Sequence, residues 1–342
     1  MNLDDLKKYD PSGIHKIYDK WPEIALESYR TDYEIPDFKN IEHIVFSGMG
    51  GSGTIGDVLS SILSKTNIHV TVVKGYLLPK TVDSNTLVVT TSMSGNTSET
   101  LTTLESATKK TKNIISFSDG GKMKTFCDKN NILHQNVSIM HSPRATFPKT
   151  FYTILKSLNN IIPIHENDVK DSLTQIKLLN YKINSANLIS ENPSLNISNW
   201  VRNLPIIYYP WGLQSAAIRF KNSFQENAKI HVIAEDVIES CHNGIVGWET
   251  KSSAQPILIQ GSDDYFRTKE RWSILKEFFT TNNIEYLDVM VTQSNILSKL
   301  MYLIYLLDYS TIYFAIKNKI NPSPVSSIDF IKSKTSKELL KD

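Results

Sequence analysis

Apolar runs that end in glycine- or serine-rich loops, each followed by a helical pattern, constrain the fold of this chain most strongly. In the first half the apolar runs cover residues 41–47, 68–73, 86–91 and 113–117. The first run enters Gly48-Met-Gly-Gly-Ser-Gly53, and the third enters Ser92-Met-Ser-Gly-Asn-Thr97. Helical patterns follow these two loops, at residues 54–63 and 98–110. Strands that alternate with helices at this spacing predict a parallel sheet with helices on both faces.

The second half of the chain repeats this rhythm, although no strong duplication of residues accompanies it. Its apolar runs cover residues 204–209, 230–234, 256–260 and 284–290, and its helical patterns cover residues 213–227, 264–280, 294–317 and a last segment from 326. A length of 342 residues suits two domains of ordinary size. We therefore predict an α/β chain with two mostly parallel sheets, each in a three-layer αβα sandwich. The predicted divisions are an N-terminal domain with a leading helix at 1–155, a helical connection at 156–195, and a C-terminal domain with a closing helix at 196–342.

Charge and cysteine usage exclude several classes of function. The net charge is +2, from 37 Lys and Arg against 35 Asp and Glu, so the chain has no field for non-specific binding of nucleic acid or an anionic membrane. Two cysteines can build neither a disulfide framework nor a cysteine-rich zinc site. Residues 1–10 lack the apolar core of a signal peptide, and Asp308 interrupts the apolar stretch 300–316, which predicts a buried helix. We expect a cytoplasmic protein without nucleic-acid or membrane partners.

The two loops that follow the first and third runs are candidate anion sites. Ligands of parallel sheets bind beyond the carboxyl ends of the strands, where both loops are expected to lie. Each loop precedes a helix, whose free N–H groups and dipole favour an anion. Ser52, Ser92, Ser94 and Thr97 add hydroxyl donors, and the glycines allow close approach of the backbone. These features predict a phosphate site that needs no lysine.

The first loop also matches the dinucleotide fingerprint G-x-G-x-x-G, but that match alone is weak. The next strand ends in Val73-Lys74-Gly75, without the carboxylate that would hold a ribose. Lys74 is left as a candidate partner for the extra phosphate of NADP. The second, hydroxyl-rich loop has no role in a dinucleotide site, which disfavours NAD(P). Glycine-rich turns with serine helix caps and no ligand are a fair alternative for either loop alone, and a poor one for both together.

The segment Ser92-Met-Ser-Gly-Asn-Thr-Ser-Glu-Thr100 resembles the signature of sugar isomerase (SIS) domains. Together with the first loop, Pro143-Arg144, Glu226-Asn-Ala-Lys229 and His242-Asn243, it falls in the order seen in archaeal bifunctional phosphoglucose/phosphomannose isomerases. The resemblance spans about residues 40 to 335. It implies two SIS-type domains in one chain and isomerisation of glucose 6-phosphate, and of mannose 6-phosphate, to fructose 6-phosphate through an enediol.

The resemblance also implies site residues, with no cofactor and no metal. The phosphate would be bound by Gly51, Ser52, Ser92, Ser94 and Thr97. Glu226 would move the proton between C1 and C2, and Arg144 would stabilise the enediolate. His242 would assist ring opening and would be donated across a homodimer interface. A C-terminal lysine lines the family's site; Lys332 fits best, and Lys334 is an alternative.

The chemistry suits these residue types, but the residues alone do not select them. A buried glutamate can act as a base near neutral pH, a fixed arginine can stabilise an oxyanion, and a histidine titrates in the range that ring opening needs. Taken singly, Glu226, Arg144 and His242 are typical of ordinary surface or structural side chains. The eight histidines and two cysteines show no ligand spacing for a metal. A non-catalytic sugar-phosphate sensor built from SIS domains is the alternative function.

Overall fold

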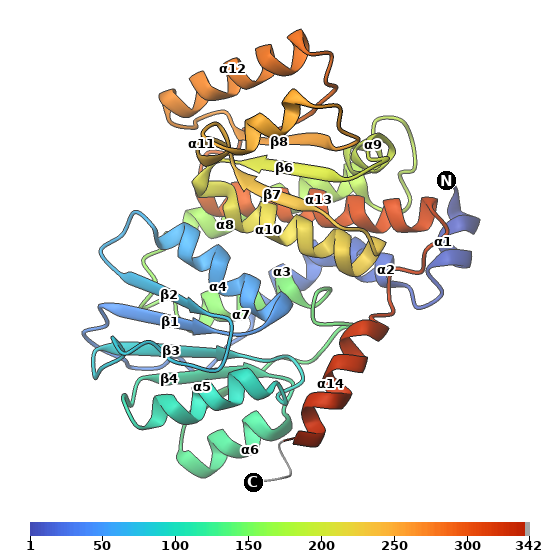
Figure 1. Cartoon of the computed structure of the whole chain (residues 1–342). Coiled ribbons are helices and arrows are strands. Elements are labelled where there is room, and N and C mark those ends of the chain that lie inside the picture. Colours follow the sequence, from blue (N-terminus) through green and yellow to red (C-terminus); the bar gives the residue numbers. More distant parts are fainter. Residues whose placement is uncertain (339–342) are drawn as a thin grey trace.

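The computed structural model describes the backbone of residues 1–338 and the side chains of residues 1–334. It contains two parallel sheets (Figure 1). The first has the order β2-β1-β3-β4-β5, with β1 His43–Ser47, β2 His69–Val73, β3 Thr86–Thr91, β4 Ile114–Ser118 and β5 Leu133–Asn136. The second has the order β7-β6-β8-β9, with β6 Pro205–Tyr209, β7 Ile233–Asp236, β8 Gln255–Gly261 and β9 Leu287–Val291. Every paired strand is parallel to its neighbour, as predicted.

Helices connect and cover the strands. In the first half they are α1 Leu3–Tyr9, α2 Ile14–Asp19, α3 Trp21–Arg30, α4 Gly50–Leu63, α5 Ser98–Thr108, α6 Gly121–Asn130, α7 Phe147–Ser157 and α8 Glu166–Ile183. In the second half they are α9 Pro193–Trp200, the 3₁₀ turn η1 Trp211–Leu213, α10 Gln214–Ser223, the π-helical turn η2 Phe224–Ala228, α11 Val237–Ser240, the 3₁₀ segment η3 Gly244–Glu249, α12 Phe266–Thr281, α13 Ile296–Lys317 and α14 Ser326–Glu338.

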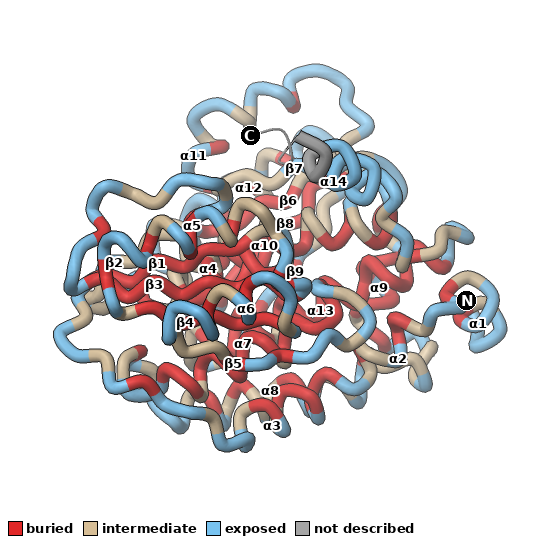
Figure 2. Tube along the Cα trace, turned by 90° about the horizontal axis from the view of Figure 1, so that it is seen from below, coloured by how far each residue is buried: buried red, intermediate tan, exposed pale blue. Residues whose placement is uncertain are grey.

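Alternate residues of each strand face two different apolar layers, as expected for a sheet that is buried on both sides. In β1, Val45 packs with α5 and α6 residues such as Leu104 and Met123, whereas Ile44 and Phe46 join the central core. Residues of the second sheet reach the same central core, and the opposite face of that sheet packs against α11 and α12. Each sheet is therefore the middle of three layers, and one continuous core joins the two domains. Figure 2 shows this core as buried strands and helices inside an exposed rim.

The structure corrects several expected bounds. The fifth strand β5 and the helix α6 before it were not predicted, because both are short and polar. The strand predicted at 230–234 is β7, which begins only at Ile233, where its pairing with Ile206 begins. The strand predicted at 284–290 begins at Leu287 for the same reason, since it pairs there with Ile257. The predicted connection 156–195 contains α8, but α7 and α9 cross its two ends. The domain divisions remain a prediction.

Helix α13 lies at the centre of the molecule, and nearly every residue from Leu297 to Ile316 is buried. None of the described helices is long and apolar enough to pass through a membrane. The charge of Asp308 is accommodated by Arg219 of α10, whose Nη2 and Nε lie 2.6 and 2.9 Å from its Oδ2. Ser223 donates to Oδ1 at 2.7 Å, and Tyr18 donates to Oδ2 at 3.2 Å. The buried carboxylate is thus paired and hydrogen-bonded, as burial of a charge requires.

Replacing Asp308 with Asn should leave the buried Arg219 without its counter-charge. Removal of one partner of a buried ion pair costs about 3–5 kcal/mol, so we expect a loss of that size in the free energy of unfolding. Urea titration followed by circular dichroism measures the change. Lys276→Met, which breaks the more exposed pair between Lys276 and Asp288, is the control and should cost less than about 1 kcal/mol. Equal losses in the two variants would contradict a special role for the buried pair.

Candidate active site at the carboxyl edge of the first sheet

The two predicted phosphate loops meet because β1 and β3 are neighbours in the first sheet, with Ser47 opposite Thr90. The first loop leaves β1 and begins α4 at Gly50; the second leaves β3 and begins α5 at Ser98. A Cβ on Gly48 would lie 3.0 Å from the carbonyl oxygen of Thr91, so the loops approach backbone to backbone. The N-cap residues of α4 and α5, Met49 and Thr97, make no capping hydrogen bond through their side chains. The first amides of both helices are therefore not occupied by such a cap.

The hydroxyl groups of the second loop lie in different settings. Ser92 is buried, and its Oγ donates to Thr97 Oγ1 at 2.8 Å. Ser94 is exposed, and its Oγ accepts a weak hydrogen bond from the amide of Asn96 at 3.3 Å. Ser52 is buried in the first turn of α4. Hydroxyls and helix amides thus converge on one edge of the sheet, an arrangement that can hold a dianionic phosphate without a lysine.

Asn96 is a residue that the sequence analysis missed, and it fixes the shape of the second loop. Its Nδ2 donates to the carbonyl of Ser94 at 2.8 Å, and its Oδ1 accepts from the amide of Lys122 at 3.1 Å. Gly95 has a φ of +64°, and a Cβ on it would lie 1.8 Å from the carbonyl oxygen of Gly120. The loop is therefore seated on the start of α6 at a contact that only glycine permits. The glycine pair at 120 and 121, directly after β4, was the available signal.

Arg144 lies beside the first loop. A Cβ on Gly51 would lie 3.5 Å from the Cα and amide nitrogen of Arg144, so the two backbones are in contact. The guanidinium is buried and has four acceptors. Its Nε donates to Asn227 Oδ1 at 2.7 Å, and its Nη2 donates to the carbonyls of Pro322 and Ser323 at 2.8 and 3.0 Å. Its Nη1 lies 3.4 Å from Glu226 Oε2. The structure thus brings Arg144 and Glu226 together from positions 82 residues apart.

Glu226 lies in the π-helical turn η2 that ends α10, and about a quarter of its side chain is exposed. Turns of this kind are rare and are common at functional sites. The turn ends at Lys229, which has a φ of +60° and donates its Nζ to the carbonyls of Glu226 and Pro322 at 2.6 and 3.1 Å. Partial desolvation and the nearby Arg144 charge lower the pKa of Lys229 to about 8. Lys229 therefore connects the turn that carries Glu226 to the segment at Pro322. The sequence analysis included Lys229 in the motif Glu226-Asn-Ala-Lys229 but gave it no role.

His242 is not brought to this site within the chain. It follows α11 and β7, at the carboxyl edge of the second sheet, whereas Glu226 precedes β7 at the amino edge. The helix from Gln214 to Glu226 separates these edges by about 18 Å at 1.5 Å per residue. Figure 1 shows α11 at one end of the second sheet and the end of α10 at the other.

A different histidine, His141, lies near Arg144 in the same chain. Its φ of +94° is unusual for a residue with a side chain, and its Nε2 lies 3.3 Å from Ser323 Oγ. Burial, and then the charge of Arg144, lower the pKa of His141 below its usual value. Sequence reasoning gave this residue no role, although it lies two residues before the Pro143-Arg144 motif.

Both candidate lysines, Lys332 and Lys334, are exposed on α14. This helix begins directly after the segment held by Arg144 and lies alongside the first domain (Figure 1). Lys334 Nζ lies 5.6 Å from the centre of the Phe330 ring. The positions of these two lysines on α14 do not distinguish which of them lines the site, so Lys332 stays the predicted residue and Lys334 the alternative.

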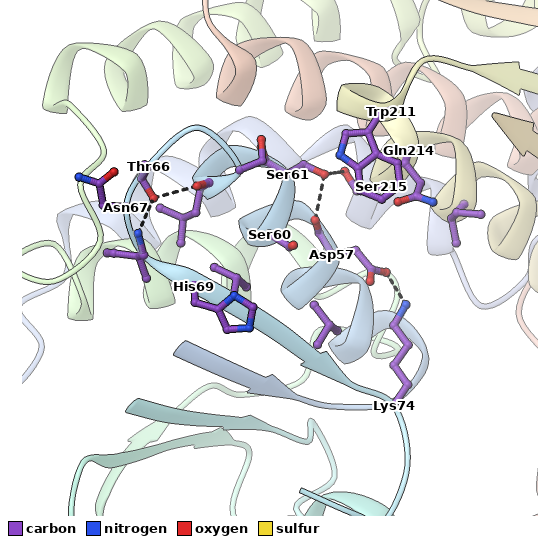
Figure 3. A pocket seen from close by; sticks show the side chains of 16 residues that line it. Asp57, Ser60, Ser61, Thr66, Asn67, His69, Lys74, Trp211, Gln214 and Ser215 are labelled. Atoms are coloured by element: carbon purple, nitrogen blue, oxygen red, sulfur yellow. Dashed lines mark hydrogen bonds and ion pairs between the residues drawn. The ribbon is translucent and has the colours of Figure 1, made fainter. Parts of the chain in front are cut away.

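A cavity of about 800 Å³ lies between α4, β2 and the start of α10 (Figure 3). It is lined by hydroxyl-bearing residues of α4 and by Trp211 and Gln214, and none of the predicted site residues lines it. Lys74, the candidate partner for an NADP phosphate, lies here with its Nζ against Asp57. Among the described residues, no group of three or more His, Cys, Asp or Glu side chains is arranged to hold a metal ion.

Comparison with known proteins agrees with the geometry. Residues 37–154 match the SIS domain, and residues 190–335 match the bacterial phospho-glucose isomerase C-terminal SIS domain. The chain is 30% identical over 335 residues to a bifunctional phosphoglucose/phosphomannose isomerase from Caldicellulosiruptor bescii, covering 95% of this chain and 96% of the relative. The chain belongs to this bifunctional isomerase family. Its predicted membership and its two-domain SIS fold are confirmed.

The chain is also similar to an enzyme with a different activity. A D-glucosamine-6-phosphate 4-epimerase from Sulfolobus acidocaldarius is 30% identical over 249 residues, covering 72% of this chain and 77% of the relative. Among solved structures, a hypothetical protein from Thermus thermophilus superposes with a TM-score of 0.72 at 14% identity, covering 98% of this chain and 93% of that one. That likeness supports the fold of this family member and says nothing of its substrate.

Gly95→Ala should disrupt the second of the two predicted phosphate loops, since the new Cβ would collide with the Gly120 carbonyl. We expect binding of inorganic phosphate, measured by calorimetry, to weaken by at least about tenfold because the helix amides and hydroxyls lose their alignment. Gly75→Ala is the matched control, since no atom lies within 4 Å of its added Cβ. Phosphate binding that survives Gly95→Ala unchanged would remove this loop from the phosphate site.

Proposed function

We propose that this chain interconverts glucose 6-phosphate and mannose 6-phosphate with fructose 6-phosphate through an enediol intermediate. The relatives' names support an isomerase of these sugar phosphates. The observation that carries the proposal is the pairing of a partly exposed carboxylate, Glu226, with a buried guanidinium, Arg144, whose backbone lies against the start of α4, a helix without a side-chain N-cap. In this proposal the phosphate, the base and the oxyanion partner meet at the carboxyl edge of the first sheet. We place the reaction in the cytoplasm.

In this proposal the phosphate is bound by Gly51, Ser52, Ser92, Ser94 and Thr97. Binding of the phosphate far from the reacting carbons positions C1 and C2 beside Glu226. The Glu226 carboxylate removes the proton from one carbon, holds it, and returns it to the other. Arg144 Nη1, which faces Glu226, stabilises the negative charge that develops on oxygen. No metal and no redox cofactor takes part in these steps.

Hexose phosphates are mostly closed rings, so the proposal includes a ring-opening group. We assign this role to His242 of a second copy of the chain, because the His242 of the same chain lies at the far edge of the second sheet. A homodimer related by a twofold axis would contain two such shared sites. Lys332 of α14, with Lys334 as the alternative, would complete the wall of the site.

Glu226→Gln tests the base. The variant keeps the size and hydrogen-bonding capacity of the side chain but loses the proton acceptor, so turnover of fructose 6-phosphate should fall by about 10²–10⁴-fold. A coupled assay for glucose 6-phosphate measures turnover, and calorimetry should show substrate binding within about threefold of wild type. The exposed Glu277→Gln on α12 serves as the control. Near-normal turnover in Glu226→Gln would remove the base assignment.

The same assay separates the competing functions. Wild-type protein without added metal should convert both glucose 6-phosphate and mannose 6-phosphate. Turnover of glucosamine 6-phosphate alone would instead place the chain with the 4-epimerase relative. Binding of all these sugars without turnover would indicate a sensor.

Mixing chains tests the shared site. Glu226→Gln and His242→Ala chains, co-expressed with different tags, should form heterodimers that each hold one site with both residues intact. Random assortment of such twofold dimers should restore about a quarter of wild-type activity. In the control mixture, His231→Ala chains are co-expressed with Glu226→Gln chains in place of the His242→Ala chains. No recovery would contradict the donation of His242 by the second copy and would direct the search to His141 of the same chain.

A further inference from the structure

Asp308 and Thr311 are two polar residues one turn apart on the buried helix α13. Their side chains contact Arg219 and Asn227, which in turn contact Arg144 of the proposed site. Asp308 and Thr311 are both fully buried. Thr311 Oγ1 donates to the carbonyl oxygen of Asp308 at 2.7 Å and accepts from Asn227 Nδ2 at 2.9 Å. Asn227, itself fully buried, accepts at its Oδ1 from Arg144 Nε at 2.7 Å. A continuous row of hydrogen bonds thus runs from the helix to the guanidinium that faces Glu226.

The two groups at the ends of this row, the Arg144 guanidinium and the Asp308 carbonyl, determine the direction of every hydrogen bond in it. An arginine can only donate, and the Asp308 carbonyl can only accept. Because Thr311 gives its single proton to that carbonyl, its oxygen is an acceptor for Asn227. The amide of Asn227 must therefore turn its nitrogen toward Thr311 and its oxygen toward Arg144. Thr311 and Arg144 thereby require the same orientation of the Asn227 amide, and Thr311 holds that amide from the side opposite Arg144.

The main chain of Arg144 is held by the same helix through a second route. The Asp308 carboxylate pairs with Arg219, whose Nη2 donates to the carbonyl oxygen of Arg144 at 3.0 Å. The guanidinium of Arg219 is also stacked over the Phe147 ring at 4.1 Å. One helix therefore holds Arg144 at its backbone and at its side chain.

We propose that Thr311 is a positioning residue for the isomerase reaction, acting through Asn227 to point the Arg144 guanidinium at Glu226 and the substrate. This inference rests on the function proposed above. Asn227, Pro322 and Ser323 engage Nε and Nη2, which leaves Nη1 as the edge that faces the carboxylate. A planar guanidinium that loses its Nε partner can rotate, and the Nη1 edge then leaves the reacting oxygen. Loss of about 1 Å in such alignment is costly in turnover.

Thr311→Val removes the hydroxyl with little change in shape. It should lower kcat by about tenfold and change KM by less than about twofold, because the phosphate loops still hold the ground state. Thr311→Ser should recover most of kcat, since its hydroxyl can accept from Asn227. Thr311→Ala repeats the test if valine destabilises the core. Ser310→Ala is the matched control: it removes a buried hydroxyl on the same turn, which donates to the Leu307 carbonyl and contacts no site residue.

An effect that passes through Arg144 must vanish when Arg144 is absent. In an Arg144→Met background, measured at raised enzyme concentration, Thr311→Val should have no further effect on kcat. An equal fold-loss in both backgrounds, or an unchanged kcat in Thr311→Val and Thr311→Ala of an active enzyme, would overturn the proposal.

A readout that does not depend on activity separates this inference from the proposed function. In protein labelled with ¹⁵N-arginine, the buried Nε–H of Arg144, assigned by its loss in Arg144→Met, should exchange slowly with solvent in the wild type. Thr311→Val should accelerate that exchange at least about tenfold, while Ser310→Ala should not. Unchanged exchange overturns the positioning role. Accelerated exchange in a protein that lacks isomerase activity would support the hydrogen-bond row and refute only the proposed function.

Discussion

The carboxylate of Asp308 is buried near the middle of a mostly apolar helix, and its pairing with Arg219 is the constraint on which the rest of the structure depends. Burial of two charges costs several kcal/mol for each ion, and only good geometry with further hydrogen bonds offsets that cost. Tyr18 and Ser223 supply those hydrogen bonds from α2 and from the end of α10. The pair can therefore form only when these elements and α13 are packed in one arrangement. An apolar helix with the same shape could slide or rotate; one that carries this pair has a single register.

That register joins the two domains at the proposed site. Arg144 belongs to the segment after the first sheet, Glu226 to the helix after the first strand of the second sheet, and Pro322 to the segment before α14. Contacts from α13 hold the first two, through Arg219 and Asn227, and Arg144 then holds the third. Glu226 and Arg144 thus lie where the two halves of the chain meet, and contacts that begin on α13 hold both of them. The π-helical turn places the Glu226 carboxylate at the end of a helix. Its neighbours Phe224, Asn227 and Ala228 are buried, and they hold that end in place.

The sequence predicted the parts of the site that are local in the chain. A strand, a glycine- or serine-rich loop and a helix follow each other within about twenty residues, so the pattern of apolar residues places Ser52, Ser92 and Thr97 at the edge of the sheet. Glu226 and Arg144 came only from a resemblance, since one glutamate near a helix end and one arginine in a loop carry no pattern. Asn227, Lys229 and Thr311 were missed. Their partners lie 84 residues away, for Asn227 with Thr311, or 93, for Lys229 with Pro322, and periodicity contains no information on such contacts. The short, polar β5 and α6 were missed because neither has a continuous apolar run.

The position of His242 has a consequence for how activity depends on assembly. In a doubly wound sheet, a helix that follows one strand returns the chain to the amino edge, so groups before and after the next strand lie at opposite edges. Glu226 and His242 flank β7 in this way, so they lie at opposite edges of the second sheet in one chain. If the two residues serve one substrate, the fold itself requires a second copy, and dilution should then abolish ring opening before it abolishes the isomerisation of an open-chain sugar. If His141 opens the ring instead, both steps should persist in a monomer. The dependence of ring opening on protein concentration therefore distinguishes His242 of a second copy from His141 of the same chain as the ring-opening group.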